Sequence, residues 1–149
     1  MENSTPPSNR LTWVIGGAQG SGVDSAANIF SRACAQGGLH IFGKREYYSN
    51  IKGEHSYFTV RVSDNPIRSH VDEINILVSF DAETVFKHAD KVTKGGAIIY
   101  DLGLVKTNIN EVPTIDKYAA ERISKTLEKS GKDFTIQGML NYAQDRGVF

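Results

Sequence analysis

Two stretches of this chain contain residue types that could do chemistry: a glycine-rich turn near the N-terminus and a polar, aromatic stretch that follows it. The first runs from Leu11 to Ala27 and reads LTWVIGGAQGSGVDSAA, an apolar run that breaks into glycines and resumes with small residues. This pattern predicts a strand, a tight turn and the start of a helix. The free N–H groups of such a turn form a potential anion site.

The spacing of the glycines argues against the two best-known phosphate-binding turns. Gly17, Gly20 and Gly22 allow positive φ and let the first helical turn approach a neighbour closely. A P-loop would need a lysine and a hydroxyl where Val23 and Asp24 stand. The dinucleotide motif G-x-G-x-x-G is not met either, because the order of its gaps is reversed. The spacing alone favours a turn that closes the fold, and Asp24 then favours the helix N-terminus through the helix dipole.

The second stretch, Lys44 to Ser56, has the sequence KREYYSNIKGEHS and no helical or strand periodicity. We interpret it as a loop. Its mixture of cations, hydroxyls, an amide and aromatic side chains is typical of a ligand or partner surface. The residues assigned to this surface are Lys44, Arg45, Glu46, Tyr47, Tyr48, Ser49, Asn50, Lys52 and Gly53.

One hypothesis for these residues is a free-standing NADP- or nucleotide-binding α/β protein. Glu46 lies at the distance after the glycine turn at which dinucleotide-binding proteins keep the acid that binds the ribose. Lys44 and Arg45 could instead hold a 2′-phosphate. The order of the glycines argues against this hypothesis. The position of Glu46, beyond Gly43 and inside the expected loop, argues against it as well.

Other catalytic constellations are missing from the sequence. The histidines at 40, 55, 70 and 88 have no metal-ligand spacing, so we expect no metal site. Ser21 lies between glycines, but the outer spacing of G-x-S-x-G is absent and no base is identifiable. We therefore assign no catalytic residue to this chain.

Composition indicates one globular domain. The 149 residues are 40% hydrophobic and 23% charged with a net charge of zero, so nothing drives the chain toward nucleic acid. No apolar run approaches the roughly 18 residues of a membrane span. The only cysteine, Cys34, excludes an internal disulfide and a cluster site, which favours a cytoplasmic protein. We expect a disordered leader over 1–10 and a single α/β domain over 11–149.

The order of the expected elements indicates an α/β fold. After the first strand we expect a helix over 21–36 and strands over 39–43, 57–63, 74–80 and 97–101. We also expect helices over 82–88, from 113–116 to about 129, and over about 141–146. We expect a mainly parallel, Rossmann-like sheet with helices on both faces and a helical C-terminal segment. The 39–43 strand should be parallel to the first. Asp81 and Gly131 should begin and end their helices.

Taken together, the two stretches resemble one known family. Ile15 to Gly22 (IGGAQGSG) with Arg45 to Ser56 (REYYSNIKGEHS) is similar to the gamma domain of the 2-oxoacid:ferredoxin oxidoreductases. The resemblance covers about residues 11–101 and continues less distinctly over 113–149. It is closest to the archaeal form, in which the gamma domain is fused ahead of the alpha domain. Because the alpha domain is missing here, we expect a fragment or an expressed domain.

The resemblance implies a complex that decarboxylates a 2-oxoacid oxidatively, with thiamine diphosphate, Mg²⁺, iron–sulfur clusters, coenzyme A and ferredoxin. A gamma domain binds no cofactor by itself; it packs beside the alpha and beta domains and helps to enclose the substrate and coenzyme A side of the site. We assign Lys52, Asn50 and Ser49 to substrate binding and the rest of the polar stretch to an interface. Such a domain should expose an apolar patch, on the 23–33 helix or the C-terminal segment.

Overall fold

The computed structural model describes residues 10–47, 55–67 and 73–149. Its main elements, in chain order, are β1 (Arg10–Ala18), α1 (Val23–Gln36), β2 (His40–Tyr47), β3 (His55–Ser63), β4 (Ile74–Ser79), α2 (Ala82–His88), β5 (Val92–Ile99), α3 (Lys117–Lys129) and α4 (Ile136–Asp145). Short 3₁₀ turns lie at Ala89–Lys91, Leu102–Leu104 and Ile109–Glu111. Among the described helices, none has the length and apolar character required to cross a membrane. The leader expected over 1–10 lies outside the described residues, apart from Arg10.

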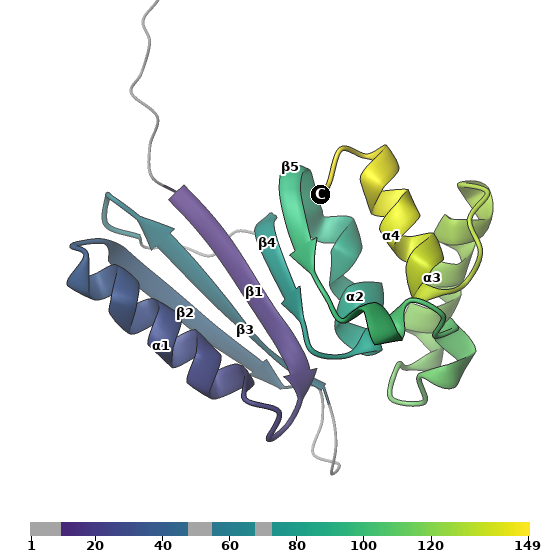
Figure 1. Cartoon of the computed structure of the whole chain (residues 1–149), viewed down its shortest axis with the longest axis horizontal. Coiled ribbons are helices and arrows are strands. Elements are labelled where there is room, and N and C mark those ends of the chain that lie inside the picture. Colours follow the sequence, from purple (N-terminus) through teal and green to yellow (C-terminus); the bar gives the residue numbers. More distant parts are fainter. Residues whose placement is uncertain (1–9, 48–54, 68–72) are drawn as a thin grey trace, which may run out of the picture.

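The five strands form one sheet in the order β2-β3-β1-β4-β5 (Figure 1). β1 pairs with β4 in parallel, and β4 pairs with β5 in parallel. β3 is antiparallel to both β1 and β2, so it alone is reversed among these strands. The expected mainly parallel α/β sheet is confirmed. β2 has the direction of β1, as expected, although β3 lies between the two strands.

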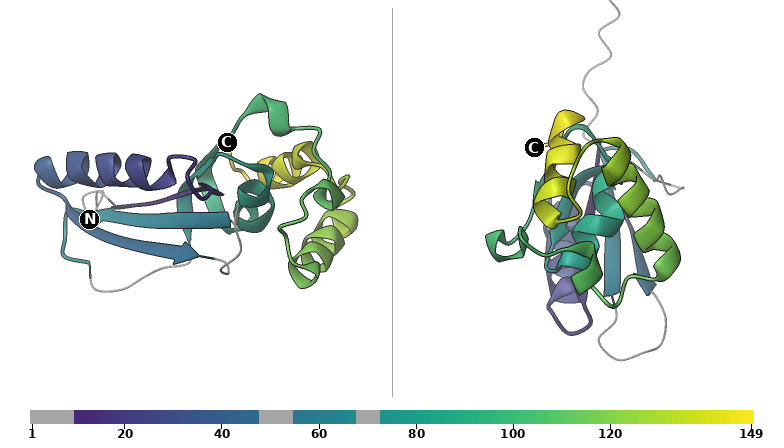
Figure 2. Two further views of the ribbon diagram at one scale, coloured as in Figure 1. Left: turned by 90° about the horizontal axis from the view of Figure 1, so that it is seen from below. Right: turned by 90° about the vertical axis from the view of Figure 1, so that its right-hand side faces the viewer.

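Helices cover both faces of the sheet, as expected (Figure 2). Side chains of a strand alternate between the faces, so Trp13 and Ile15 of β1 pack toward α1 while Val14 packs on the opposite side. The Trp13 ring stacks on Phe30 of α1 with 4.5 Å between the ring centroids. The opposite core joins the sheet to α2, α3 and α4. Ala27 of α1 is fully buried, which allows the helix to lie close to the strands.

The helix boundaries follow local capping signals. Asp81 accepts a hydrogen bond from Thr84 N at 2.9 Å and begins α2, as expected. α3 ends ahead of Gly131, whose φ of +67° is suited to glycine. The last helix begins at Ile136 rather than at residue 141, because the Thr135 side chain accepts from Gly138 N and caps an earlier turn.

Two other expectations about the elements are wrong. The strand expected over 97–101 is β5, which begins at Val92 and passes through Gly95 and Gly96, with a shift of register opposite Ile74 to Ile76 in β4. Glycine at this irregularity is suited to the bend, since Gly95 has φ +85°. Most of the small-residue face of α1 is covered by the sheet of the same chain, and of the small residues on that face only Ala33 is exposed. Exposed large apolar side chains do occur toward the C-terminal side of β5, at Ile99 and at Phe149.

The core on the α3 side provides a test of the fold. Leu127 is fully buried and Leu102 is 74% exposed. We expect Leu127→Ala to lower the free energy of unfolding by about 2–5 kcal/mol, because it leaves a cavity, and Leu102→Ala to change it by less than about 0.5 kcal/mol. Urea unfolding followed by circular dichroism measures both values. Equal effects of the two substitutions would contradict this packing.

Candidate functional site

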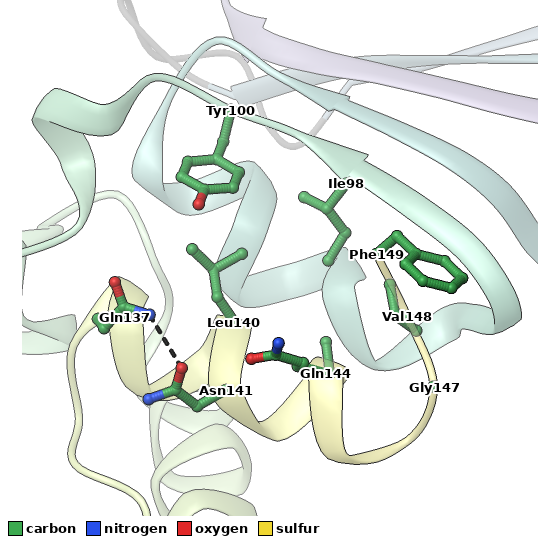
Figure 3. Close-up of a pocket in the computed structure, with 10 residues that line it drawn as sticks. Ile98, Tyr100, Gln137, Leu140, Asn141, Gln144, Gly147, Val148 and Phe149 are labelled. Carbon is green, nitrogen blue, oxygen red and sulfur yellow. Dashed lines mark hydrogen bonds between the residues drawn. The ribbon is translucent and has the colours of Figure 1, made fainter.

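The described surface has two hollows of note. The larger, about 290 Å³, lies between β5 and α4 beside the C-terminal residues (Figure 3). The smaller, about 200 Å³, lies at the glycine turn after β1. The lining of the smaller hollow consists of Gly20, Gly22, Val23, Asp24, Ser25, Arg45 and Ser56. It lies where β1 ends and α1 begins, the edge at which open α/β sheets commonly bind ligands.

The three glycines of the turn act in two ways. Gly20 and Gly22 have φ values of +83° and +98°, which side chains with a Cβ adopt at a cost. Gly17 is required for space instead: a Cβ there would lie 2.8 Å from Ser21 Oγ and 2.9 Å from Phe80 Cβ. The expected strand, turn and helix start are therefore present. Asp24 lies in the first turn of α1, as the dipole argument expects.

The polar stretch is a loop over a shorter span than expected. Lys44 to Tyr47 belong to β2, and His55 and Ser56 begin β3, with Tyr47 paired to Ser56. The expected loop is therefore wrong at both ends. The sequence of β2 shows no alternation of apolar and polar residues because β2 is an edge strand, and edge strands commonly have charged side chains.

The substrate-binding assignments fall on the part of this stretch that connects the two strands. Tyr48, Ser49, Asn50, Lys52 and Gly53 lie outside the described residues. The assignments of Ser49, Asn50 and Lys52 to substrate binding therefore stay predictions. The ends of this segment are described, and they lie beside the glycine turn, because Ala18 of β1 pairs with His55 and Gly17 with Ser56.

The charges considered for a dinucleotide are engaged with one another. Arg45 Nη1 lies 2.6 Å from Asp24 Oδ2, and Lys44 Nζ lies 2.6 Å from Glu46 Oε1. Glu46 also accepts a hydrogen bond from the Tyr57 hydroxyl. A ribose or a 2′-phosphate would have to displace these contacts, which weakens the nucleotide-binding hypothesis.

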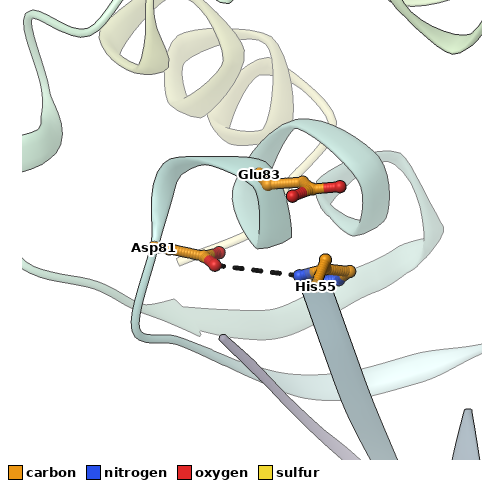
Figure 4. A group of neighbouring side chains, drawn as sticks. All are labelled: His55, Asp81 and Glu83. Carbon is orange, nitrogen blue, oxygen red and sulfur yellow. Dashed lines mark ion pairs between the residues drawn. The ribbon is translucent and has the colours of Figure 1, made fainter. Parts of the chain in front are cut away.

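A buried polar cluster that the sequence analysis missed joins β3 to α2 (Figure 4). His55 is 1% exposed, and its Nδ1 lies 3.8 Å from Asp81 Oδ2. His55 Nε2 lies 3.3 Å from His88 Nε2, so one ring donates to the other. His55 is far from Asp81 and His88 in sequence and has no motif spacing to them, so only the tertiary structure brings it to α2.

His55, Asp81 and Glu83 offer ligand atoms within 4.8 Å of one another, which is the arrangement of a candidate cation site. Each carboxylate already has other partners. Asp81 Oδ1 caps α2, while Glu83 Oε1 lies 2.8 Å from Lys87 Nζ and Glu83 Oε2 accepts from Thr114. A cation would have to displace a buried ion pair. We therefore describe the group as a structural hydrogen-bonded cluster, and the absence of a metal site stays a prediction.

The electrostatics of the cluster favour a neutral His88. Burial is the largest cause, and neighbouring positive groups add to it, so the pKa of His88 is lowered from 6.5 to about 3. For Asp81, burial raises the pKa, but hydrogen bonds from His55 and Thr84 outweigh it and the net pKa is lowered. Both groups therefore bind fewer protons in the folded chain than in the unfolded chain.

The cluster predicts a pH dependence of stability. The free energy of unfolding should be unaffected by His88 above pH 6.5 and should fall as the pH drops from 6.5 toward 3. In this range the histidine is protonated in the unfolded chain but still neutral in the folded chain. We expect His88→Gln to flatten this slope, which is at most about 1.4 kcal/mol per pH unit for one group. The exposed His40 provides the control, since His40→Gln should keep the slope of the unsubstituted chain. Denaturant unfolding across this pH range measures it, and an unchanged slope in His88→Gln would refute the assignment.

Comparison with known proteins identifies the family. The family model of pyruvate ferredoxin/flavodoxin oxidoreductase matches residues 12–141. The chain belongs to this family. A 2-oxoacid:ferredoxin oxidoreductase alpha subunit of Sulfurisphaera tokodaii is 51% identical over 139 residues, 93% of the chain and 22% of the relative. An Aeropyrum pernix alpha subunit is 31% identical over 93% of the chain and 22% of its own length.

Solved structures of this oxidoreductase family share the fold. A 2-oxoglutarate:ferredoxin oxidoreductase of Magnetococcus marinus aligns over 93% of the chain and 30% of its own chain, with a TM-score of 0.58 and 20% identity. A keto/oxoacid ferredoxin oxidoreductase gamma subunit of Geobacter sulfurreducens aligns over 64% of the chain and 53% of its own chain, with a TM-score of 0.53 and 23% identity. The resemblance to the 2-oxoacid:ferredoxin oxidoreductases is confirmed. The chain spans about a fifth of the length of the curated relatives that it matches.

Proposed function

We propose that this chain is the gamma-type domain of a thiamine diphosphate-dependent 2-oxoacid:ferredoxin oxidoreductase. The enzyme would convert a 2-oxoacid and coenzyme A to an acyl-CoA and reduce ferredoxin. The observation that carries the proposal is the 51% identity, over nearly the whole chain, to the alpha subunit of such an enzyme. The chain would act within the complex and have no activity alone.

The residues of this chain do not fit the cofactors of that reaction. An iron–sulfur cluster requires several cysteine ligands, and the chain has only Cys34, half-buried on α1. Mg²⁺ bound to a diphosphate keeps several waters and needs an open site. His55 and Glu83 are buried, and Glu83 is paired with Lys87. We therefore assign thiamine diphosphate, Mg²⁺ and the cluster to the alpha and beta partners.

The proposed role of this chain is to close the substrate and coenzyme A side of the site. The hollow at the glycine turn and the ends of β2 and β3 lie together, so one face of the domain offers a polar wall. Arg45 in that wall is neutralised by Asp24. The wall is therefore suited to shaping the site and is a poor anchor for the phosphates of coenzyme A.

Lys52 remains our candidate for the charge that meets the substrate. A 2-oxoacid is an anion, and a charge-assisted hydrogen bond that is partly shielded from water contributes about 1.5–3 kcal/mol, against about 0–1 kcal/mol for an exposed pair. The cation belongs to the segment whose two ends lie beside the glycine turn. Asn50 and Ser49 would add neutral hydrogen bonds.

Cofactor binding tests the division of labour. We expect calorimetry to detect no thiamine diphosphate binding by the isolated chain, with or without Mg²⁺, because the described residues include no set suited to that cofactor. We also expect the isolated chain not to oxidise 2-oxoacids. The positive control is the complex reconstituted with its partner polypeptides. Micromolar binding of thiamine diphosphate by the chain alone would reject the assignment. Tight binding of NADP would instead support the free-standing nucleotide-binding alternative.

A second test concerns the substrate cation. In the complete complex, Lys52→Ala should lower kcat/KM for 2-oxoacids about tenfold or more, and most for substrates with a second carboxylate. Lys125 is an exposed residue of α3, so Lys125→Ala should leave kcat/KM unchanged. Steady-state kinetics with a monocarboxylic and a dicarboxylic 2-oxoacid measures the effect. Unchanged kinetics for Lys52→Ala with both substrates would make Lys52 an ordinary surface lysine.

A further inference from the structure

The last three residues of the chain lie along the outer edge of β5. Gly95 N donates to Gly147 O at 2.8 Å, Phe149 N to Gly96 O at 2.8 Å, and Ile98 N to Phe149 O at 2.7 Å. In a parallel pair, the N–H and the C=O of one residue bond to the two residues that flank its partner on the other strand. Phe149 is therefore opposite Ala97, and the segment has the direction of β5.

The same edge continues beyond Phe149. The N–H and C=O of one strand residue point to the same side, so Ile98 C=O faces the edge to which its N–H donates. β5 ends at Ile99, and if its alternation is continued by one residue, the backbone of Tyr100 faces that edge as well. A polypeptide that continued in this register would meet these groups next.

The larger hollow lies directly along this course. Ile98 and Tyr100 form one wall, and Leu140 rises from α4 between them (Figure 3). The volume of about 290 Å³ has room for apolar side chains. Amides of α4 line it as well, and Gln137 Nε2 donates to Asn141 Oδ1 at 2.9 Å. The groove is thus apolar on the strand side and mixed on the α4 side, where Leu140 lies among the amides.

Both faces of this edge are apolar. Val148 and Ile98 are 4% and 8% exposed and face the core on the α4 side. Phe149 and Ile99, which alternate with them, are 84% and 56% exposed. A strand added here would have apolar neighbours on both faces, one packed on the α4 side and one beside the exposed Phe149 and Ile99, which favours an apolar sequence.

We propose that the edge of β5 receives an extended, apolar polypeptide strand that pairs with β5 in parallel and fills the groove against α4. The strand would come from the oxidoreductase polypeptide that follows the matched region in the longer relatives, of which this chain spans 22%. The inference rests on the proposed function only in requiring that the chain works within a longer enzyme.

A second copy of the chain fits this edge poorly. Two copies related by a twofold axis would pair their β5 edges antiparallel. The parallel segment Gly147–Phe149 already occupies part of the edge and would separate the two strands. The geometry therefore favours a parallel strand over a symmetric dimer.

The test appends to Phe149 the six or so residues that follow the matched region in the Sulfurisphaera tokodaii relative, about the usual length of a strand. Amide hydrogen exchange is then measured at Tyr100. We expect exchange in the extended chain to be slower by about tenfold or more than in the chain of 149 residues. The matched control has proline at alternate positions, beginning with the second added residue, whose N–H would otherwise donate to Ile98 C=O.

The expected results are protection in the extended chain and none in the proline control. A further variant, Leu140→Asn, should reduce the protection in the extended chain, because it removes an apolar contact in the groove. Unprotected Tyr100 in a folded, extended chain would overturn the proposal. Protection of Tyr100 that rises with the concentration of the unextended chain, with dimers in sedimentation, would assign the edge to a second copy instead. Neither outcome bears on cofactor binding, so the proposed function is tested separately.

Discussion

The close approach of β1 to the first turn of α2 is the constraint on which the rest of the structure depends. A Cβ at Gly16 would lie 2.6 Å from Thr84 Oγ1 and 3.0 Å from the His55 ring, so only glycine fits between them. Phe80 N donates to Gly16 O at 2.9 Å and holds the end of β4 against this point. The end of the central strand, the α2 cap and the start of β3 are therefore fixed relative to one another.

Much of the fold could be predicted because its signals are local. The glycine turn, the Asp81 cap and the end of α3 before Gly131 each depend on neighbouring residues. The α/β class followed from the alternation of strand and helix patterns. The extent of β2 could not be predicted, because Lys44, Arg45 and Glu46 lie in an edge strand and their charges are balanced by other residues, some of them on other elements.

The candidate site was predicted less completely than the fold, for the same physical reason. The glycine turn was identified by its residues. The pair of His55 and His88, in contrast, exists only because β3 and α2 meet next to Gly16. Such contacts have no sequence spacing. The polar wall at the glycine turn is similarly made of pieces from β1, α1, β2 and β3. A fold of this kind supports many functions, so its function has to be argued from the family and from the site.

The position of β1 in the sheet has a consequence for synthesis on the ribosome. Of the described strands, β1 is made first, yet it lies in the middle of the sheet, between β3 and β4. Its partners are complete only when the chain has been made as far as Ser79. Both edges of this apolar strand are unpaired until β3 has been made, and the edge that pairs with β4 stays open until Ser79, a state prone to aggregation. Contact between β1 and α1, which follows it directly in the chain, covers one face of this strand before its edges are paired.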